Sequence, residues 1–295
     1  MSDRTAFTAR AAGGKLAGWV SGDGPPVLVL HGGPGILDYM EPVAEELLTD
    51  YRVATFQQRG LAPSTLEGPF TIAQAISDVV SVLDELEWQR ALLVGHSWGG
   101  HLAFRVAAVH PKRLSGMLAI DPLGIVGDGG MQAFEAEIDA RTPKEGRARL
   151  HELEEKEKTA NLSPDEQDER EAIAWPAYFA DPENVMTRPP MEMREEVFSG
   201  LVSEVKEGLE EMAAALGQGE VPYGVLAGAA SPFPWGQAAR ASVELSPTAF
   251  LKVIPHAGHF VWYEAPGSVR AALHQLSHPC QPERRRPSSF GANSF

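Results

Sequence analysis

The stretch ALLVGHSWGGHLAFRVAAVH, residues 91–110, decides the fold of this chain. Its first four residues form a short apolar run, which predicts a buried strand. The apolar spacing of residues 101–110 predicts a helix that ends before Pro111. Between the two stands the pattern G-x-S-x-G, with Ser97 at its centre and a glycine two positions away on each side. In this strand–turn–helix context the pattern predicts a sharp turn that presents the Ser97 hydroxyl as a nucleophile.

The same alternation of short strands and helices continues on both sides of this turn. Helical spacing predicts helices at 38–48 and 71–87, the second opening with Thr71 as N-cap. Apolar runs predict one or two strands within residues 5–20, and further strands at 27–30, 51–56, 116–120, 221–227 and 250–254. Strands that alternate with helices indicate an α/β fold, with a mostly parallel central sheet and helices on both faces.

A change of composition divides the chain into a core and an insertion. Residues 131–172 are rich in Glu, Lys, Arg and Ala, which predicts polar helices, and the strand pattern returns at Val221. We therefore expect a sheet core made of residues 1–122 and 218–278, interrupted by a helical insertion of residues 123–217. The last residues, 279–295, read PCQPERRRPSSFGANSF and predict a flexible C-terminal tail.

Composition excludes several kinds of partner and site. The chain has 25 Lys and Arg against 40 Asp and Glu, a formal net charge of −15, and an acidic surface repels nucleic-acid phosphates. Cys280 is the only cysteine, so an intrachain disulfide and a zinc site of several thiolates are excluded. No apolar run approaches the ~20 residues of a membrane span, and residues 1–20 lack the apolar segment of a secretory signal. We expect a cytoplasmic monomer or homodimer that takes a small-molecule substrate, with no nucleic acid, membrane, metal or organic cofactor.

A serine hydroxyl needs a base to remove its proton, and histidine is the natural base near neutral pH. Among nine histidines, His259 is the best placed, because it follows the last predicted strand late in the chain. Ala257 and Gly258 before it allow a loop to bend toward the nucleophile. His256 is the competing candidate. His96 adjoins the nucleophile, and we expect it to be packed, since successive residues in a tight turn point apart.

Acyl transfer also requires donors for the negative charge that develops on the carbonyl oxygen. The glycine-rich turn HGGPG, residues 31–35, follows the predicted strand at 27–30. Its Gly33 offers one backbone N–H, whereas Pro34 has none. The residue after the nucleophile, Trp98, offers a second N–H at the start of the helix. We therefore predict an oxyanion hole formed by Gly33 and Trp98.

Four motifs in order carry a resemblance to a known family. They are HGGPG (31–35), QQRG (57–60), GHSWGG (95–100) and HAGHFVWYEAP (256–266). With these motifs the chain resembles the proline iminopeptidase branch of the α/β-hydrolases, over residues 15–122 and 221–276. The resemblance implies an α/β-hydrolase fold and implies that the insertion forms a helical cap over the active site.

The sequence departs from that branch at the acid of the catalytic triad. The branch carries an aspartate just after the penultimate strand, and this chain has Ser231 there. An acid holds the imidazole in the right tautomer and stabilises the imidazolium. Asp121 ends the strand that follows the nucleophile helix, so it is expected at the same sheet edge as Ser97. We predict Asp121 as the acid. The alternatives are an acid from the insertion or no acid at all.

A second departure concerns the substrate. In the branch, cap glutamates bind the free amine of the substrate, one of them in a W-x-x-W-E run. The nearest match here contains Trp175, Tyr178 and Phe179, with Phe179 in place of the acid. These aromatic residues predict an apolar substrate pocket. The sequence thus favours a serine hydrolase of small esters, lactones or amides. A proline iminopeptidase-type aminopeptidase and a weakly active or non-catalytic ligand-binding homologue are the alternatives.

Overall fold

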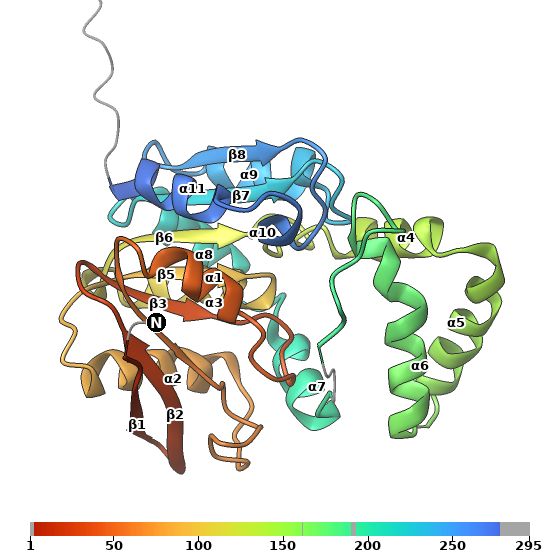
Figure 1. The fold of residues 1–295 in the computed structure, drawn as a ribbon, viewed down its shortest axis with the longest axis horizontal. Coiled ribbons are helices and arrows are strands. Elements are labelled where there is room, and N and C mark those ends of the chain that lie inside the picture. The colour runs from red at the N-terminus through yellow and green to blue at the C-terminus, as the bar shows by residue number, and fades with distance from the viewer. Residues whose placement is uncertain (1–2, 161, 190–192, 278–295) are drawn as a thin grey trace, which may run out of the picture.

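A computed structural model describes residues 3–160, 162–189 and 193–277. The tail predicted at 279–295 lies outside the described residues. The described chain is built on one sheet, shown in Figure 1 with the helices around it.

The sheet has eight strands in the order β1-β2-β4-β3-β5-β6-β7-β8. The strands β3 to β8 run parallel, while β1 and β2 are antiparallel to their neighbours. The prediction of a mostly parallel sheet is therefore confirmed. The strand bounds are β1 Thr5–Ala11, β2 Gly14–Ser21, β3 Pro26–Leu30, β4 Arg52–Phe56, β5 Ala91–His96, β6 Leu114–Ile120, β7 Tyr223–Gly228 and β8 Phe250–Ile254.

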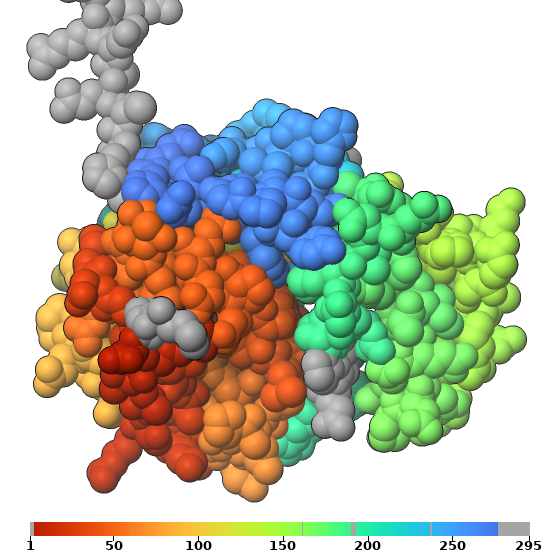
Figure 2. Space-filling model, viewed as in Figure 1, coloured from red at the N-terminus to blue at the C-terminus, as the bar shows by residue number. Residues whose placement is uncertain are grey.

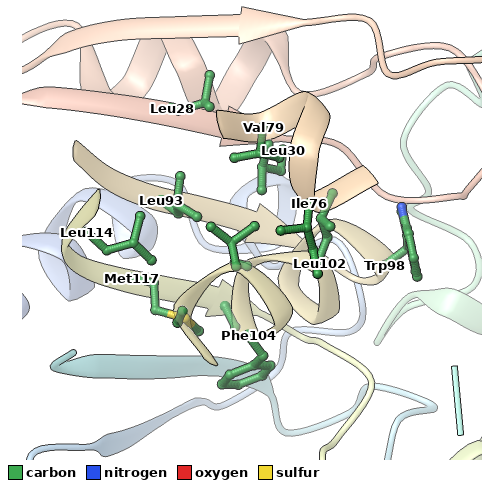
Figure 3. Close-up of a cluster of buried hydrophobic side chains, with 14 of the residues drawn as sticks. Leu28, Leu30, Ile76, Val79, Leu93, Trp98, Leu102, Phe104, Leu114 and Met117 are labelled. Atoms are coloured by element: carbon green, nitrogen blue, oxygen red, sulfur yellow. The ribbon is translucent and has the colours of Figure 1, made fainter. Parts of the chain in front are cut away.

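Helices cover both faces of the sheet, because successive side chains of a buried strand point to opposite sides. In β3, Leu28 and Leu30 join one apolar cluster, while Val27 and Val29 join another. Figure 3 shows part of the first cluster, where side chains of α2 and α3 meet those of β3, β5 and β6. The covering helices on that face are α2 Ile72–Glu85, α3 Trp98–Val109 and α8 Leu209–Gly217; on the other face they are α1 Glu41–Leu47, α10 Val261–Glu264 and α11 Ser268–Ser277.

The segment between β6 and β7 contains the helices of the insertion. These are α4 Met131–Arg141, α5 Lys144–Glu157, α6 Pro164–Ala174, the 3₁₀ turn Trp175–Tyr178, α7 Glu195–Glu204 and α8. In Figures 1 and 2, α5 and α6 form a yellow-green lobe beside the core. A short five-residue helix, α9 Arg240–Glu244, follows β7.

Part of the insertion, which was expected at residues 123–217, packs on the core. Leu209, Met212 and Leu216 of α8 are buried in the same cluster as α3. Val197 and Leu201 of α7 join that cluster as well. The position of a helix between two strands of the sequence does not determine which surface the helix covers. Only its apolar face decides that, and the apolar faces of α7 and α8 pack on the core.

A buried ion pair fixes the loop after β4 to α2. Arg59, in the QQRG motif, donates Nε and Nη2 to the two carboxylate oxygens of Asp78 at 2.8 and 2.7 Å. Its remaining N–H groups reach the carbonyls of Ala12 and Glu67. The motif thus has a structural function, since it joins three segments beside the sheet.

Candidate active site

Ser97 occupies the turn between β5 and α3 in a strained backbone conformation, with φ of +52°. The surrounding glycines are required by close packing. A Cβ atom on Gly95 would lie 2.1 Å from the carbonyl oxygen of Gly99, and one on Gly99 would lie 2.2 Å from that of Leu30. No side chain fits at those distances. The turn therefore has the shape that holds a serine up at the carboxyl edge of the sheet.

His259 meets Asp121 at the same edge. Its Nδ1 atom lies 2.6 Å from Oδ2 of Asp121. Asp121 directly follows β6 with φ of +44°, and its N–H donates to the carbonyl of Leu226 at 2.7 Å. The N–H of His259 donates to the carbonyl of Tyr178 at 2.7 Å, which ties the His259 loop to the insertion. The acid that the sequence predicted for this contact is thus the carboxylate that touches the imidazole.

Ser231 stands where the resembled branch has its acid, and it contacts the same carboxylate. Its hydroxyl donates to Oδ2 of Asp121, and the N–H of Gly228 reaches Oδ1 at 3.4 Å. Arg141 of α4 donates to the carbonyls of Ala230 and Ser231. The donors to the acid therefore come from the core, while α4 holds the loop that carries Ser231.

Burial shifts the protonation of both partners. His259 and Asp121 are only 4% and 2% exposed. Burial lowers the pKa of His259 to about 3, so its ring is neutral at neutral pH. Burial also raises the pKa of Asp121 well above its usual 3.8, while the Ser231 hydroxyl, the Gly228 N–H and the charge of Arg141 oppose this rise. A carboxylate accepts the Nδ1 proton, which leaves Nε2 of His259 as the atom that can accept a proton.

In the HGGPG loop, Gly33 offers a backbone donor near the turn. The N–H of Gly32 donates to the hydroxyl of Tyr39 at 3.1 Å, and Pro34 has no N–H. Gly33, with φ of +108°, keeps an N–H that can point to a ligand, and it lines the same cavity as Ser97. Trp98 is the first residue of α3, and first-turn N–H groups have no partner within a helix.

Gln58 connects the two segments that carry these donors. Its Nε2 donates to the carbonyl of His31 at 2.8 Å, and its Oε1 accepts the indole N–H of Trp98 at 3.0 Å. The backbone N–H of Gln58 also donates to Nε2 of His31 at 3.1 Å. The loop after β3 and the start of α3 are thereby held at a fixed separation.

A cavity of about 700 Å³ lies between the core and the insertion, and Ser97 and His259 both line it. Of the three aromatic residues predicted for a pocket, Trp175 and Tyr178 line this cavity. Phe179 does not belong to its lining. Its ring is buried in the core, stacked on Phe260 with ring centres 5.3 Å apart. The 3₁₀ turn ends at Tyr178, so the next side chain faces the core.

Most of the cavity wall is apolar, but charged residues also line it: Asp128, Glu135, Lys206 and a charged part formed by α5 and α6. Its apolar lining comes from both the core and the insertion and includes Ile36, Leu123, Met131, Phe134, Ile138, Leu150, Phe198, Val202 and Phe233. Arg170 of α6 lines the charged part and donates to Glu157 at 2.5 Å and to Glu171 at 2.9 Å. Glu154 also lines the cavity, so carboxylates outnumber the guanidinium there.

His256, the competing candidate, and His96, which adjoins Ser97, have different surroundings from His259. His256 is exposed and lines a separate surface hollow with Tyr263 and Glu264. His96 is fully buried and bonds to Tyr39 and to the carbonyl of His259. Tyr39, which sequence reasoning did not single out, lines the cavity. A tyrosine in a predicted helix carries no local signal for such a contact.

Among residues 3–160, 162–189 and 193–277, no cluster of three or more His, Cys, Asp and Glu side chains could hold a metal ion. No helix in that part of the chain has the length and apolar character needed to cross a membrane.

Sequence comparison identifies relatives of part of the chain. Epoxide hydrolase B of Mycobacterium tuberculosis is 34% identical over 101 residues, which cover 33% of this chain and 28% of that protein. The putative carbamate hydrolase RutD of a Caulobacter species is 30% identical over 109 residues, covering 36% of this chain and 41% of that protein. The chain thus spans less than half the length of these relatives.

Solved structures match nearly the whole chain. Est816, described as an N-acyl homoserine lactone degrading enzyme, is 25% identical with a TM-score of 0.62, covering 92% of this chain and 100% of that one. The enol-lactonase from Burkholderia xenovorans LB400 is 19% identical with a TM-score of 0.64, at 92% and 100% coverage, which shows the fold alone. Residues 25–185 match the family described as the alpha/beta hydrolase fold. With this match, the sheet order and the relatives named above, the chain belongs to the alpha/beta hydrolase family.

Proposed function

We propose that this protein is a serine hydrolase that cleaves a small carboxylic ester, lactone or amide through an acyl-enzyme. The contact of 2.6 Å between Nδ1 of His259 and Oδ2 of Asp121, beside the cavity that Ser97 lines, is the observation that carries the proposal. A base, the acid that orients it and a nucleophile at one sheet edge are the arrangement that acyl transfer requires.

In the first half of the reaction, Oγ of Ser97 attacks the substrate carbonyl carbon and gives its proton to Nε2 of His259. The negative charge that forms on the carbonyl oxygen is stabilised by the N–H groups of Gly33 and Trp98. The tetrahedral intermediate then collapses, the bond to the leaving group breaks, and His259 donates its proton to the departing oxygen or nitrogen. The acyl group remains on Ser97.

In the second half, water attacks the acyl carbon and gives a proton to His259. The bond to Ser97 breaks, Oγ takes that proton back, and the carboxylic acid leaves. Asp121 keeps the Nδ1 proton of His259 in place throughout and stabilises the imidazolium. In this proposal Asp121 acts as the acid in place of the one missing at Ser231.

The insertion serves as a cap in this proposal, because it closes a largely apolar cavity over Ser97. Trp175 and Tyr178 would contact the substrate there. An apolar cavity favours substrates with hydrocarbon groups. The likeness to Est816, described as degrading a lactone with an acyl chain, supports esters and lactones over other hydrolysable bonds.

A second candidate function is an aminopeptidase of the proline iminopeptidase type, which the motifs resemble. The observation in its favour is that three glutamate side chains line the cavity: Glu154, Glu157 and Glu171. A buried amine needs such a partner. The two candidates separate on substrates: a proline amide cleaved faster than short acyl esters would favour the aminopeptidase.

The test uses a fluorophosphonate probe, which reacts with activated serines, on the wild type and on Ser97→Ala. We expect labelling of the wild type at Ser97, hydrolysis of p-nitrophenyl esters, and loss of both in the variant. A folded wild-type protein that binds esters without labelling or turnover would contradict the proposal and select a ligand-binding homologue.

A further inference from the structure

Tyr39 connects two segments of the site through one hydroxyl. The hydroxyl accepts the N–H of Gly32 at 3.1 Å and lies 2.6 Å from Nδ1 of His96. A Cβ atom added to Gly32 would lie only 2.1 Å from this oxygen and 3.1 Å from Cβ of Ser97. The tyrosine hydroxyl therefore occupies the space that a side chain at position 32 would need, directly beside the nucleophile turn.

His96 extends the connection to a third segment. Its Nε2 lies 3.1 Å from the carbonyl oxygen of His259. A carbonyl can only accept, so Nε2 carries the proton and Nδ1 is the acceptor for the hydroxyl of Tyr39. The resulting chain of bonds runs from the N–H of Gly32 through Tyr39 and His96 to His259, with each donor matched to an acceptor.

The two side chains are fixed by packing as well as by hydrogen bonds. The ring of Tyr39 stacks on Trp262 with ring centres 6.3 Å apart, and His96 is fully buried. The ring centres of His96 and His259 are 4.3 Å apart. Burial lowers the pKa of His96 well below its usual 6.5, so the ring stays neutral. A neutral ring keeps one donor and one acceptor, as this arrangement needs.

We propose that Tyr39 and His96 are positioning residues, which hold the oxyanion loop and the loop of the general base at a fixed separation around Ser97. The proposal rests on the hydrolase function proposed above. Neither residue supplies a proton or charge to the reaction. Their effect is geometric, because displacements of about 1 Å at reacting groups cost up to about 100-fold in rate.

The first test is Tyr39→Phe, which removes the hydroxyl and keeps the ring. We expect kcat to fall about 10- to 100-fold while KM changes by less than about threefold, since the ring still lines the cavity. The matched control is Tyr223→Phe. That buried hydroxyl donates to the carbonyl of Ser242 at 2.6 Å, does not line the cavity, and belongs to the apolar cluster on the other face of the sheet from Tyr39. The control should lower the melting temperature and leave kcat unchanged.

The second test asks whether Tyr39 acts through His96 or whether Tyr39→Phe only loosens the packing of the site. His96→Phe should lower kcat as Tyr39→Phe does, and the two changes together should lower it by less than the product of their separate effects. His96→Gln, whose amide can still donate to the carbonyl of His259, should retain more activity than His96→Phe.

Fluorophosphonate labelling of Ser97 distinguishes the two proposals. A wild type that is not labelled at Ser97 overturns both. A labelled wild type with an equal labelling rate and kcat in Tyr39→Phe overturns the positioning role alone. The positioning role is also overturned if Tyr223→Phe lowers kcat as much as Tyr39→Phe does. It is overturned as well if the effects of the changes at positions 39 and 96 multiply independently.

Discussion

Nδ1 of His259 lies 2.6 Å from Oδ2 of Asp121, although the two residues are 138 positions apart in the sequence. The sheet order explains the contact. The strand β6, which Asp121 follows, lies between β5, which leads to Ser97, and β7. Parallel neighbouring strands end at one edge, so an acid after β6 reaches the same imidazole as an acid after β7 would.

The first prediction concerns Asp121→Asn. The amide matches the carboxylate in shape but cannot hold the Nδ1 proton of His259 as a carboxylate does, so we expect kcat to fall by about 10³- to 10⁴-fold. Circular dichroism should show an unchanged fold. Steady-state hydrolysis of a p-nitrophenyl ester measures the effect, and near-normal turnover would exclude Asp121 as the acid.

The second prediction is that the acid can be moved to position 231. The Ser231 hydroxyl already contacts the carboxylate oxygen that His259 contacts. In the double variant Asp121→Asn and Ser231→Asp, a carboxylate returns to that neighbourhood, and we expect at least about a tenfold gain in kcat over Asp121→Asn alone.

Ser231→Asp on its own is the control for this exchange. It would place two carboxylates side by side in a buried site, where like charges raise one pKa and oppose ionisation. Its kcat at neutral pH should therefore lie below that of the wild type. A double variant no more active than Asp121→Asn would show that position 231 cannot orient His259.

Local patterns single out most residues of the candidate site, because these residues stand in short motifs. The run into Ser97, the glycine turn with Gly33 and the late His259 each carry a signal within a few residues. Asp121 could be proposed because strand ends share an edge, even though no motif marks it. The strands and the helices α2 and α3 followed from periodicity for the same reason.

Other features depend on which distant surfaces meet, and the sequence does not contain that information in local form. Tyr178 and Phe179 are adjacent aromatic residues with the same predicted environment, yet one lines the cavity and the other packs on Phe260. Tyr39 acquires its partners only when its loop folds against β5. The helix α8 lies in the insertion by its position in the chain, and only the structure shows that its buried face packs on the core.

The third prediction concerns Gly33→Ala. Gly33 has φ of +108°, which alanine rarely adopts, and a Cβ there would lie 2.8 Å from Cγ1 of Ile36. The loop must shift, and its N–H would leave the predicted oxyanion position. Loss of one such donor lowers kcat by about 10²- to 10³-fold. We expect that fall with little change in KM, measured on the same ester; a wild-type kcat would argue against Gly33 as a donor.

The fourth prediction is a loss of stability in acid caused by buried histidines. Burial lowers the pKa of His101 and of His259 to about 3, and it also lowers those of His31 and His96. In the unfolded chain these rings titrate near 6.5. Below that pH the unfolded state binds more protons than the folded state, so the free energy of unfolding falls as pH decreases toward 3.

Asp121 acts in the opposite direction. Because its pKa is raised above the usual 3.8, the folded state binds this proton at a higher pH than the unfolded chain does. This carboxyl therefore favours folding as pH falls. One carboxyl does not offset four rings. Urea unfolding at about pH 7 and about pH 5 should show a lower free energy at the lower pH, by about 1.4 kcal/mol per pH unit for each ring that titrates. Equal stability at both values would contradict the neutral burial of these histidines.

The fifth prediction concerns the length of the acyl group. Ile138 of α4 lines the cavity and packs with Ala174 and Ala177 inside the insertion. In Ile138→Trp the larger side chain would take up space in the part of the cavity that α4 lines. We expect kcat/KM for a decanoyl ester to fall by about tenfold or more, and that for an acetyl ester to change by less than about threefold, since a small acyl group needs only the space next to the nucleophile. Ala172→Trp on the exposed side of α6 adds the same indole outside the cavity and should leave both values unchanged.

Equal losses of kcat/KM on both esters in Ile138→Trp would mean that the acyl group does not extend toward α4. The insertion would then bind the leaving group instead.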